Sequence, residues 1–269
     1  MDFELDIGSC ADLVRRGDHD RFLAIMSAPV KSRGALFVIY AFNLEVVRAP
    51  WVTKEPMISE MRLQWWIDSI DEIYENLILK YNSKKAIVYN TVQSYRIDRL
   101  EYIEKLYHSF STLDVQIGIK LVRGAYMDKE RERSKAFNYL DPIHKTKKDT
   151  DKSFNSCMTF MFKNVQFFSV FIGSHNEESN YLALELINKY NIIKDKVWFS
   201  QLYGMSDHIT YNLSNQGFNV TKYLPFGPFK GVIPYLFRRA EENTAVEGQT
   251  SRELFLYAKE IKRRNHSKL

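Results

Sequence analysis

Five short runs of strand-forming residues alternate with helical patterns over the second part of the chain. Apolar strands separated by helices indicate a parallel sheet with helices covering its faces, and so an α/β fold. Right-handed crossovers between such strands give either an open doubly wound sheet or a closed barrel, and periodicity alone does not choose between them. The predicted strands are AIVY (86–89), GIKLV (118–122), SVFIG (169–173), VWFSQ (197–201) and VTKYL (220–224).

The first 80 residues lack this alternation and are predicted to be helical. The run ALFVIYAFNLEVV (35–47) is apolar nearly all round, which is typical of a helix buried between partners. Farther along, apolar residues recur at helical spacing and predict one apolar stripe. That stripe consists of Leu63, Trp66, Ile67, Ile70, Ile73, Tyr74 and Leu77.

The net charge of +5 is divided unevenly along the 269 residues. Residues 1–76 carry 8 Lys/Arg against 13 Asp/Glu, whereas residues 77–269 carry 30 against 20. The shift supports a seam between two parts of the chain. The basic part favours an anionic cofactor or a lipid surface. Its Lys and Arg residues are spread through the strands and helices instead of forming a stripe, which argues against a nucleic-acid partner.

Two cysteines, Cys10 and Cys157, form neither a disulfide framework nor a zinc pattern, so no metal site is predicted. The start MDFELDIGSC is acidic and lacks the basic beginning of a secretory signal. No apolar stretch is long enough to span a membrane. These features predict a reducing, cytoplasmic location.

Polar residues cluster at or after the carboxyl ends of the predicted strands. Barrel enzymes place their active sites at this edge, and five strand ends that each supply polar groups are unusual for pure packing. Any one of them also has a structural reading, because a single His is usually a hydrogen-bonded core residue. The candidates are Gln93, Arg123 with Gly124 and Ala125, His175 with Asn176, Gln201 and Tyr223.

The adjacent pair Arg238–Arg239 is suited to binding a small carboxylate. Each guanidinium is a planar fork that holds a carboxylate through two hydrogen bonds. On a helix, Tyr235 lies three and four residues before the pair, and Glu242 lies four and three after it, so the group shares one surface. The alternative is a solvated basic turn with ion pairs at i,i+4 spacing.

Five ordered motifs resemble the proline dehydrogenase family of flavoproteins over about residues 82–269. They are AIVYNTVQSYRIDRLEYI, GIKLVRGAYMDKER, FIGSHNEESN, VWFSQLYGMSDHI and TKYLPFGPFKGVIPYLFRRAEENT. The resemblance implies an eight-stranded (β/α) barrel of which this chain holds the last five strands. The first three strands, with a Lys and an Asp of the family's active site, have no counterpart in residues 1–80.

About residues 8–76 resemble the N-terminus of squalene/phytoene synthase-like proteins. The chain is therefore expected to have a helical part over residues 1–80 and an incomplete barrel over residues 81–269. The aspartate-rich motifs that hold Mg²⁺ against a diphosphate in prenyl synthases are missing from residues 8–76, because FVIYAFN is followed by LEVVRAP. Prenyl transfer by this part is not expected.

The proline dehydrogenase resemblance implies FAD as cofactor and oxidation of L-proline to 1-pyrroline-5-carboxylate. Electrons would pass to a quinone-type acceptor, with peripheral contact at an inner membrane. Arg238 and Arg239 would clamp the carboxylate, Glu242 would orient them, and Tyr223 would pack on the substrate ring. The implied flavin-binding residues are Gln93, Arg123, Gly124, Ala125, Lys147, His175, Asn176 and Gln201.

Two further readings stand beside the enzyme. One is a non-catalytic interaction or assembly protein built from the synthase-like helices. The other is an inactive fusion product. Loss of three barrel strands makes catalysis by this chain alone doubtful, and a partner chain supplying those strands is the remaining route to activity. The family often has an Arg just before the motif LVRGAY, and this chain has Lys120 there. A Lys cannot form the two parallel hydrogen bonds of an Arg, so the flavin contact expected from this position is not assured.

Overall fold

The computed structural model describes residues 3–48, 56–136, 138–225, 232–233, 235–237 and 249–266. Contacts divide the chain into two compact units, Met1–Ile73 and Tyr74–Leu269, each of which is described by itself. Arg238, Arg239 and Glu242 lie outside the described residues. Within the described residues, no helix is long and apolar enough to cross a membrane.

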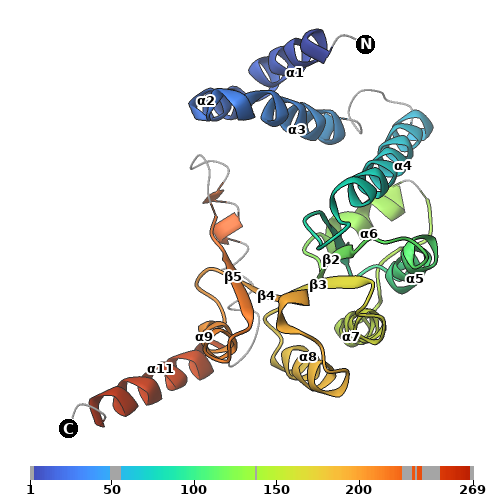
Figure 1. The fold of residues 1–269 in the computed structure, drawn as a ribbon. Coiled ribbons are helices and arrows are strands. Elements are labelled where there is room, and N and C mark those ends of the chain that lie inside the picture. Colours follow the sequence, from blue (N-terminus) through green and yellow to red (C-terminus); the bar gives the residue numbers. More distant parts are fainter. Residues whose placement is uncertain are drawn as a thin grey trace. The chain divides into compact units, whose positions relative to one another are not determined.

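The first unit contains α1 (Phe3–Gly17), α2 (His19–Ser27), α3 (Val30–Arg48) and the start of α4 (Pro56–Tyr81) (Figure 1). Asp18 begins α2, because its carboxylate accepts a hydrogen bond from the Arg21 N–H at 3.0 Å. A small core forms from Val14, Ile25, Phe37 and Ala41. The apolar run 35–47 predicts a helix buried between partners, and within α3 Phe37 and Ala41 are buried whereas Val38 and Ile39 are exposed.

The second unit is built on a parallel sheet of five strands in the order β1-β2-β3-β4-β5. The predicted α/β fold is therefore confirmed. Each strand pairs with the next one along the chain, which is what right-handed strand–helix–strand units produce. The strands are β1 (Tyr89–Gln93), β2 (Ile117–Val122), β3 (Phe168–Gly173), β4 (Val197–Leu202) and β5 (Asn219–Tyr223).

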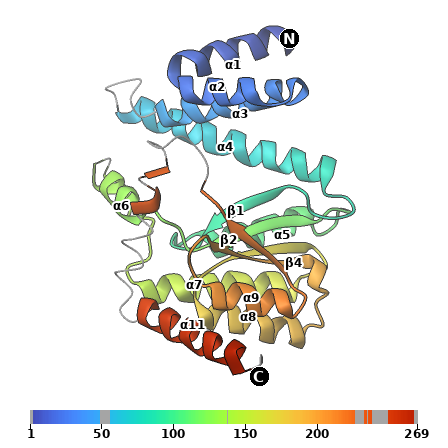
Figure 2. The ribbon, with the colours of Figure 1, turned by 90° about the vertical axis from the view of Figure 1, so that its left-hand side faces the viewer.

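Helices connect these strands, and α7, α8 and α9 lie together along one side of the sheet (Figure 2). A short 3₁₀ helix, η2 (Lys194–Lys196), precedes β4. After α4, the helices of this unit whose bounds lie within the described residues are α5 (Arg99–Phe110), α6 (Met127–Ala136), α7 (Lys147–Lys163), α8 (Glu177–Lys189), α9 (Asp207–Asn215) and α11 (Gln249–His266).

The two faces of the sheet differ in character. Alternate residues of the central strands, such as Ile119, Val170 and Phe199, are fully buried and join the main core. The opposite face carries Phe171 and Trp198, whose rings stack with centroids 6.2 Å apart. The Lys120 ammonium lies 5.3 Å from the Phe171 ring centroid on that face. The near-continuous apolar pattern therefore reflects one buried face and one aromatic, half-buried face.

The prediction for the first strand was wrong by three to four residues. Asn82 explains the difference, because its amide oxygen accepts hydrogen bonds from the N–H groups of Ile87 and Val88, both at 2.9 Å. Its amide nitrogen donates to the carbonyl oxygens of Val88 and Gln116. Residues 86–88 are thus tied to a buried side chain, and the sheet begins only at Tyr89.

The predicted apolar stripe of α4 is only partly buried. Tyr74 enters the core of the second unit, and its hydroxyl donates a hydrogen bond to the Gly118 carbonyl oxygen at 2.8 Å. Gly118 also permits the close approach of the neighbouring strand, because a Cβ there would lie 2.2 Å from the Val88 oxygen. Ile70 and Ile73 are exposed, Leu77 is half-buried, and the side chains of Leu63, Trp66 and Ile67 lie outside the described residues.

Asp98 at the start of α5 accepts paired hydrogen bonds from both Arg96 and Arg99. Burial raises the pKa of its carboxyl, but the hydrogen bonds and charges of the two arginines outweigh burial and bring the pKa well below its ordinary value. A lowered folded-state pKa stabilises the protein above the ordinary value, and that contribution is lost as the pH falls.

Asp98→Asn is therefore expected to lower the free energy of unfolding at pH 7 by about 1 kcal/mol after solvent screening. The difference from wild type should shrink as the pH falls below about 4, because the Asp98 carboxyl of the unfolded chain is then protonated while that of the folded protein stays ionised to lower pH. Urea unfolding between pH 7 and pH 2.5 measures this. Glu101→Gln, which removes an exposed pair with Lys105 on the same helix, is the control with little expected effect. A pH-independent difference for Asp98→Asn would contradict the assignment.

Candidate cofactor and substrate site

The carboxyl ends of the five strands bring the described candidate residues to one edge of the sheet. Gln93 ends β1, Arg123 follows β2, His175 follows β3, and Tyr223 ends β5. Gln201 is the penultimate residue of β4. In a parallel sheet these ends meet at the same edge, where enzymes of this class bind ligands.

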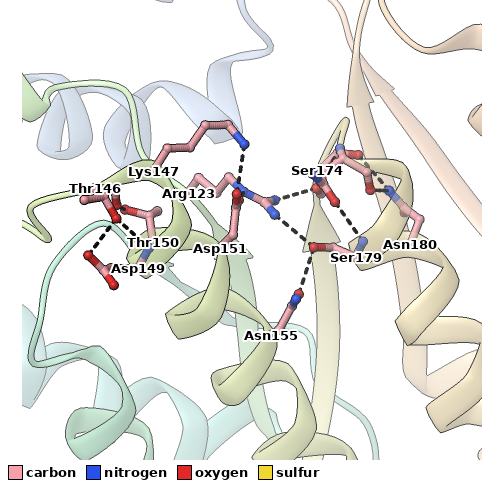
Figure 3. A network of polar contacts seen from close by, with 11 residues as sticks. Arg123, Thr146, Lys147, Asp149, Thr150, Asp151, Asn155, Ser174, Ser179 and Asn180 are labelled. Carbon is pink, nitrogen blue, oxygen red and sulfur yellow. Dashed lines mark hydrogen bonds and ion pairs between the residues drawn. The ribbon is translucent and has the colours of Figure 1, made fainter.

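Arg123 is the centre of a polar network at this edge (Figure 3). Its Nε donates to Asp151 Oδ1 at 2.6 Å, Nη1 to Ser174 Oγ at 2.7 Å and Nη2 to Ser179 Oγ at 2.9 Å. The guanidinium carbon lies 4.4 Å from the ring centroid of Phe154. Arg123 itself follows β2, and its three partners lie on α7, after β3 and on α8.

Asp151 lies between two cations. Its second carboxylate oxygen accepts a hydrogen bond from Lys147 Nζ at 2.8 Å, one helical turn earlier on α7. Burial raises the pKa of the Asp151 carboxyl, but hydrogen bonds from Lys147 and Arg123 outweigh it and lower the pKa overall. The carboxylate is ionised at neutral pH, so Arg123, Lys147 and Asp151 together carry a net charge of +1.

Two helices begin at this network. Thr146 caps α7, with its hydroxyl accepting from the Asp149 N–H at 3.1 Å and lying 2.7 Å from Asp149 Oδ2. Asn176 caps α8, with its side-chain oxygen accepting from the Ser179 N–H at 2.8 Å. Helix N-termini favour negative charge, which adds to the positive balance of the site.

His175 is held by contacts within the protein. Its Nε2 lies 3.4 Å from the Leu202 backbone N–H, and its Nδ1 lies 3.2 Å from Ser206 Oγ. The direction of the contact with Leu202 makes Nε2 the acceptor, which is compatible with a proton on Nδ1. Through these contacts His175 fixes the turn after β4, in which Gly204 and Ser206 have positive φ values of 76° and 53°.

Gln201 is almost fully buried, and its side chain also bonds within the protein. Its amide nitrogen donates to the Ser174 carbonyl oxygen at 3.3 Å, and its amide oxygen accepts from Thr210 Oγ1 at 2.9 Å. His175 and Gln201 thereby join the ends of β3 and β4. The family resemblance implies flavin contacts for both residues, which stay predictions, and these internal bonds give each a positioning role.

Gly124 has a φ of 108°, a conformation that L side chains rarely adopt. A Cβ at this position would lie 1.6 Å from the ring of buried Tyr95. The position therefore requires a glycine because the Tyr95 ring packs against it, whether or not a cofactor also approaches. Ala125 next to it is exposed, and Gln93 is half-buried.

Tyr223 is half-exposed at the end of β5, and its ring centroid lies 5.6 Å from that of Tyr235. The two aromatic members of the predicted substrate group are therefore neighbours. Arg238, Arg239 and Glu242 lie outside the described residues, so their predicted roles stay predictions. Lys222, beside Tyr223, forms an ion pair with Asp207 at 2.6 Å, and Tyr257 of α11 donates to the same carboxylate at 2.8 Å.

The sequence analysis missed several residues that organise the site. Asp151 has a detectable signal, because it lies four residues after Lys147 at the spacing of a helical ion pair. Ser174, Ser179 and Asn155 have none, since serine and asparagine occur throughout the surface of such proteins. Their roles follow only from the meeting of β3, α7 and α8 around one guanidinium.

The parallel sheet with its polar carboxyl edge defines an α/β protein of the class that binds ligands beyond the strand ends. A family model described as proline dehydrogenase matches residues 59–252. The chain belongs to the proline dehydrogenase family. The match begins within α4, in a stretch that the sequence analysis assigned to the helical part.

Two curated proline dehydrogenases are similar to the chain in sequence. The chain is 39% identical over 221 residues to proline dehydrogenase 2, mitochondrial, of Arabidopsis thaliana, covering 77% of this chain and 46% of that protein. It is 36% identical over 218 residues to proline dehydrogenase 1, mitochondrial, of Dictyostelium discoideum, covering 78% and 38%. The chain thus spans less than half the length of these two relatives.

A solved structure has a similar fold. Proline utilization A from Bdellovibrio bacteriovorus superposes with a TM-score of 0.58, covering 82% of this chain and 20% of that one. The sequence identity of the pair is 21%, so the likeness concerns the fold alone.

Proposed function

We propose that this chain carries the flavin and substrate site of an FAD-dependent dehydrogenase that oxidises L-proline to 1-pyrroline-5-carboxylate. The observation that carries the proposal is the Arg123 network at the carboxyl edge of the sheet. Membership of the proline dehydrogenase family supplies the reaction class. The relatives named mitochondrial support an organellar setting for those proteins, and a cytoplasmic place for this chain stays a prediction.

The donor set at this edge suits FAD. Arg123 and Lys147 outweigh the single charge of Asp151, and the N-termini of α7 and α8 lie at the same place. Such a positive site with helix N-termini is well matched to the diphosphate of a dinucleotide. Gln93, half-buried at the end of β1, offers an amide group to the polar parts of the flavin, while Gln201 and Asn176 bond within the protein and hold the strand ends in place. A flavin accepts a hydride from carbon when bound, and that is the chemistry it would supply here.

The chain's own residues bind and orient the substrate in this proposal. Arg238 and Arg239 hold the carboxylate through charge-assisted hydrogen bonds, and Glu242 fixes their orientation. Tyr223, supported by the ring of Tyr235, packs against the apolar ring of the substrate and restricts its size. A quinone-type electron acceptor and peripheral membrane contact belong to the same proposal.

We further propose that the five strands correspond to the last five of a (β/α)₈ barrel. The buried face of the sheet packs on helices, while the opposite face carries Lys120, Phe171 and Trp198, as an inward-facing barrel surface does. The outer strand β5 is half-buried along most of its length, unlike β2, β3 and β4. Strands supplied by another chain would cover such an edge.

Residues 1–80 are proposed to be a helical segment of squalene/phytoene synthase-like origin, distinct from the barrel of residues 81–269. The support for a separate origin lies in α1, α2 and α3, which precede the family match and have a small core of their own, whereas the match begins at residue 59 and Tyr74 of α4 lies in the core of the second unit. On this basis the second candidate function is a non-catalytic interaction or assembly role of these helices. The inactive-fusion reading predicts neither a bound flavin nor a partner.

The purified protein is expected to show flavin absorbance bands that bleach when L-proline is added without oxygen. The reason is that proline oxidation reduces the bound flavin, and without oxygen nothing reoxidises it. An absorbance spectrum recorded before and after addition measures this, with D-proline as the matched control. A folded, monodisperse protein that binds no added FAD would overturn the proposal and favour the interaction role.

A further inference from the structure

The guanidinium of Arg123 is restrained on three sides by groups from different elements. Asp151 belongs to α7, Ser174 follows β3, and Ser179 lies in the first turn of α8. Ser179 is completely buried, and its hydroxyl donates in turn to Asn155 Oδ1 at 2.8 Å. Ser174 Oγ also accepts the Asn176 N–H at 3.1 Å. Each partner of the arginine is therefore itself held in place.

This arrangement leaves part of the guanidinium available. Arginine has five N–H donors, and the three contacts use one on each nitrogen. One donor remains on Nη1 and one on Nη2, and the Arg123 side chain retains 21% of its surface exposed. Arginine loses much rotamer freedom when it is ordered, so an unrestrained Arg123 would have to be fixed at the moment of binding.

We propose that Asp151, with Ser179 and Asn155 behind it, is a positioning residue that orients the remaining Arg123 donors toward acceptor atoms of the flavin. The inference rests on the proposed function and adds which residues make its flavin site ready to bind. Asp151 acts through Arg123 and touches neither cofactor nor substrate. Phe154 supports the same orientation by lying against the guanidinium plane.

The sign of one mutational effect separates positioning from simple electrostatics. Asp151→Asn removes a negative charge and raises the net charge of the Arg123, Lys147 and residue 151 group from +1 to +2. If charge balance alone governed binding, the anionic FAD would bind more tightly. If Asp151 positions Arg123, FAD binds more weakly, because an amide oxygen holds the guanidinium less firmly than a carboxylate.

We expect the FAD dissociation constant of Asp151→Asn to rise at least about tenfold over wild type. The midpoint potential of the bound flavin should stay as in wild type, because this donor set is matched to the diphosphate and not to the redox-active ring. Titration of flavin-free protein with FAD and a redox titration of the loaded protein measure these quantities. Asp149→Asn, on the same turn of α7 but bonded to Thr146, is the matched control with an effect below about twofold.

Two further measurements make the result decisive. Ser179→Ala removes the hydroxyl contact to Nη2 without changing charge, and it is expected to weaken FAD binding about threefold or more. Combining Asp151→Asn with Arg123→Met should add nothing to the loss from Arg123→Met, since Asp151 acts through that arginine. Thermal unfolding of the flavin-free variants verifies that each is folded.

Unchanged or tighter FAD binding by Asp151→Asn would overturn the positioning role while leaving the proposed function in place. Additive losses in the double variant would also overturn it. Failure of wild-type protein to bind FAD would overturn both. A folding defect in Asp151→Asn alone would leave Ser179→Ala to decide, with unchanged FAD affinity in that variant counting against the inference.

Discussion

Replacement of Arg123 by Met is expected to reduce FAD affinity by at least about 100-fold, equivalent to about 2.7 kcal/mol. The change removes the charge and all five donors of a guanidinium at the carboxyl edge of the sheet. It also leaves the Ser174 and Ser179 hydroxyls, both buried, without their arginine contacts. Loss of such contacts should lower the free energy of unfolding by about 2 kcal/mol.

Fluorescence titration with FAD and urea unfolding measure the two effects of Arg123→Met separately. Arg131→Met is the matched control, because Arg131 is similarly exposed and pairs with Asp141 at 3.4 Å away from the network. Arg131→Met should leave FAD affinity within about twofold of wild type. Wild-type FAD affinity in a folded Arg123→Met protein would rule out this arginine as a flavin-binding residue.

Replacement of Arg239 by Met should raise the proline dissociation constant by at least about 100-fold, while FAD binding stays intact. The predicted role is a charge-assisted clamp on the substrate carboxylate, and Met retains the length of the side chain but none of its donors. The loss should appear in KM more than in kcat, because a carboxylate contact is made equally in the substrate and the transition state.

Anaerobic titration of the flavin bands with proline measures the effect of Arg239→Met. Arg264→Met is the control, since Arg264 of α11 is exposed and bonded to Glu260 at 2.8 Å. That control is expected to bind proline as wild type does. An unchanged proline affinity in Arg239→Met would show that the carboxylate is bound elsewhere.

The sequence predicted the central strands well because their signal is local. Residues 118–122, 169–173 and 197–201 are apolar runs that match β2, β3 and β4 within a residue at each end. It misplaced the first strand because the side chain of Asn82, a single residue several positions upstream, captures the backbone of Ile87 and Val88. The periodicity of apolar residues gives no sign of a hydrogen bond between a side chain and the backbone.

The candidate site could be predicted only where one residue type carries a chemical signal. Arg123 was a candidate because polar residues gather at the strand ends, and Lys147 was a candidate only through the family resemblance. Their organisation through Ser179 and Asn155 was not found, because these contacts depend on how α7 and α8 meet. The family resemblance implies a cofactor role for Gly124, whereas the packing reason for this glycine, the ring of Tyr95, appears only in the fold.

The Arg123 network also has a consequence for the order in which the protein assembles. The bond from Arg123 to Ser179 joins residues 56 positions apart, and the bond to Asp151 joins residues 28 positions apart. Such distant contacts form only after the intervening chain has been ordered, because closing the loop costs entropy that the contact offsets only once it has formed. We therefore expect β2, α7, β3 and α8 to come together before the arginine is fixed. Cofactor capture would then be a late event of folding, and a nascent chain released before α8 is made would have no organised place for the dinucleotide.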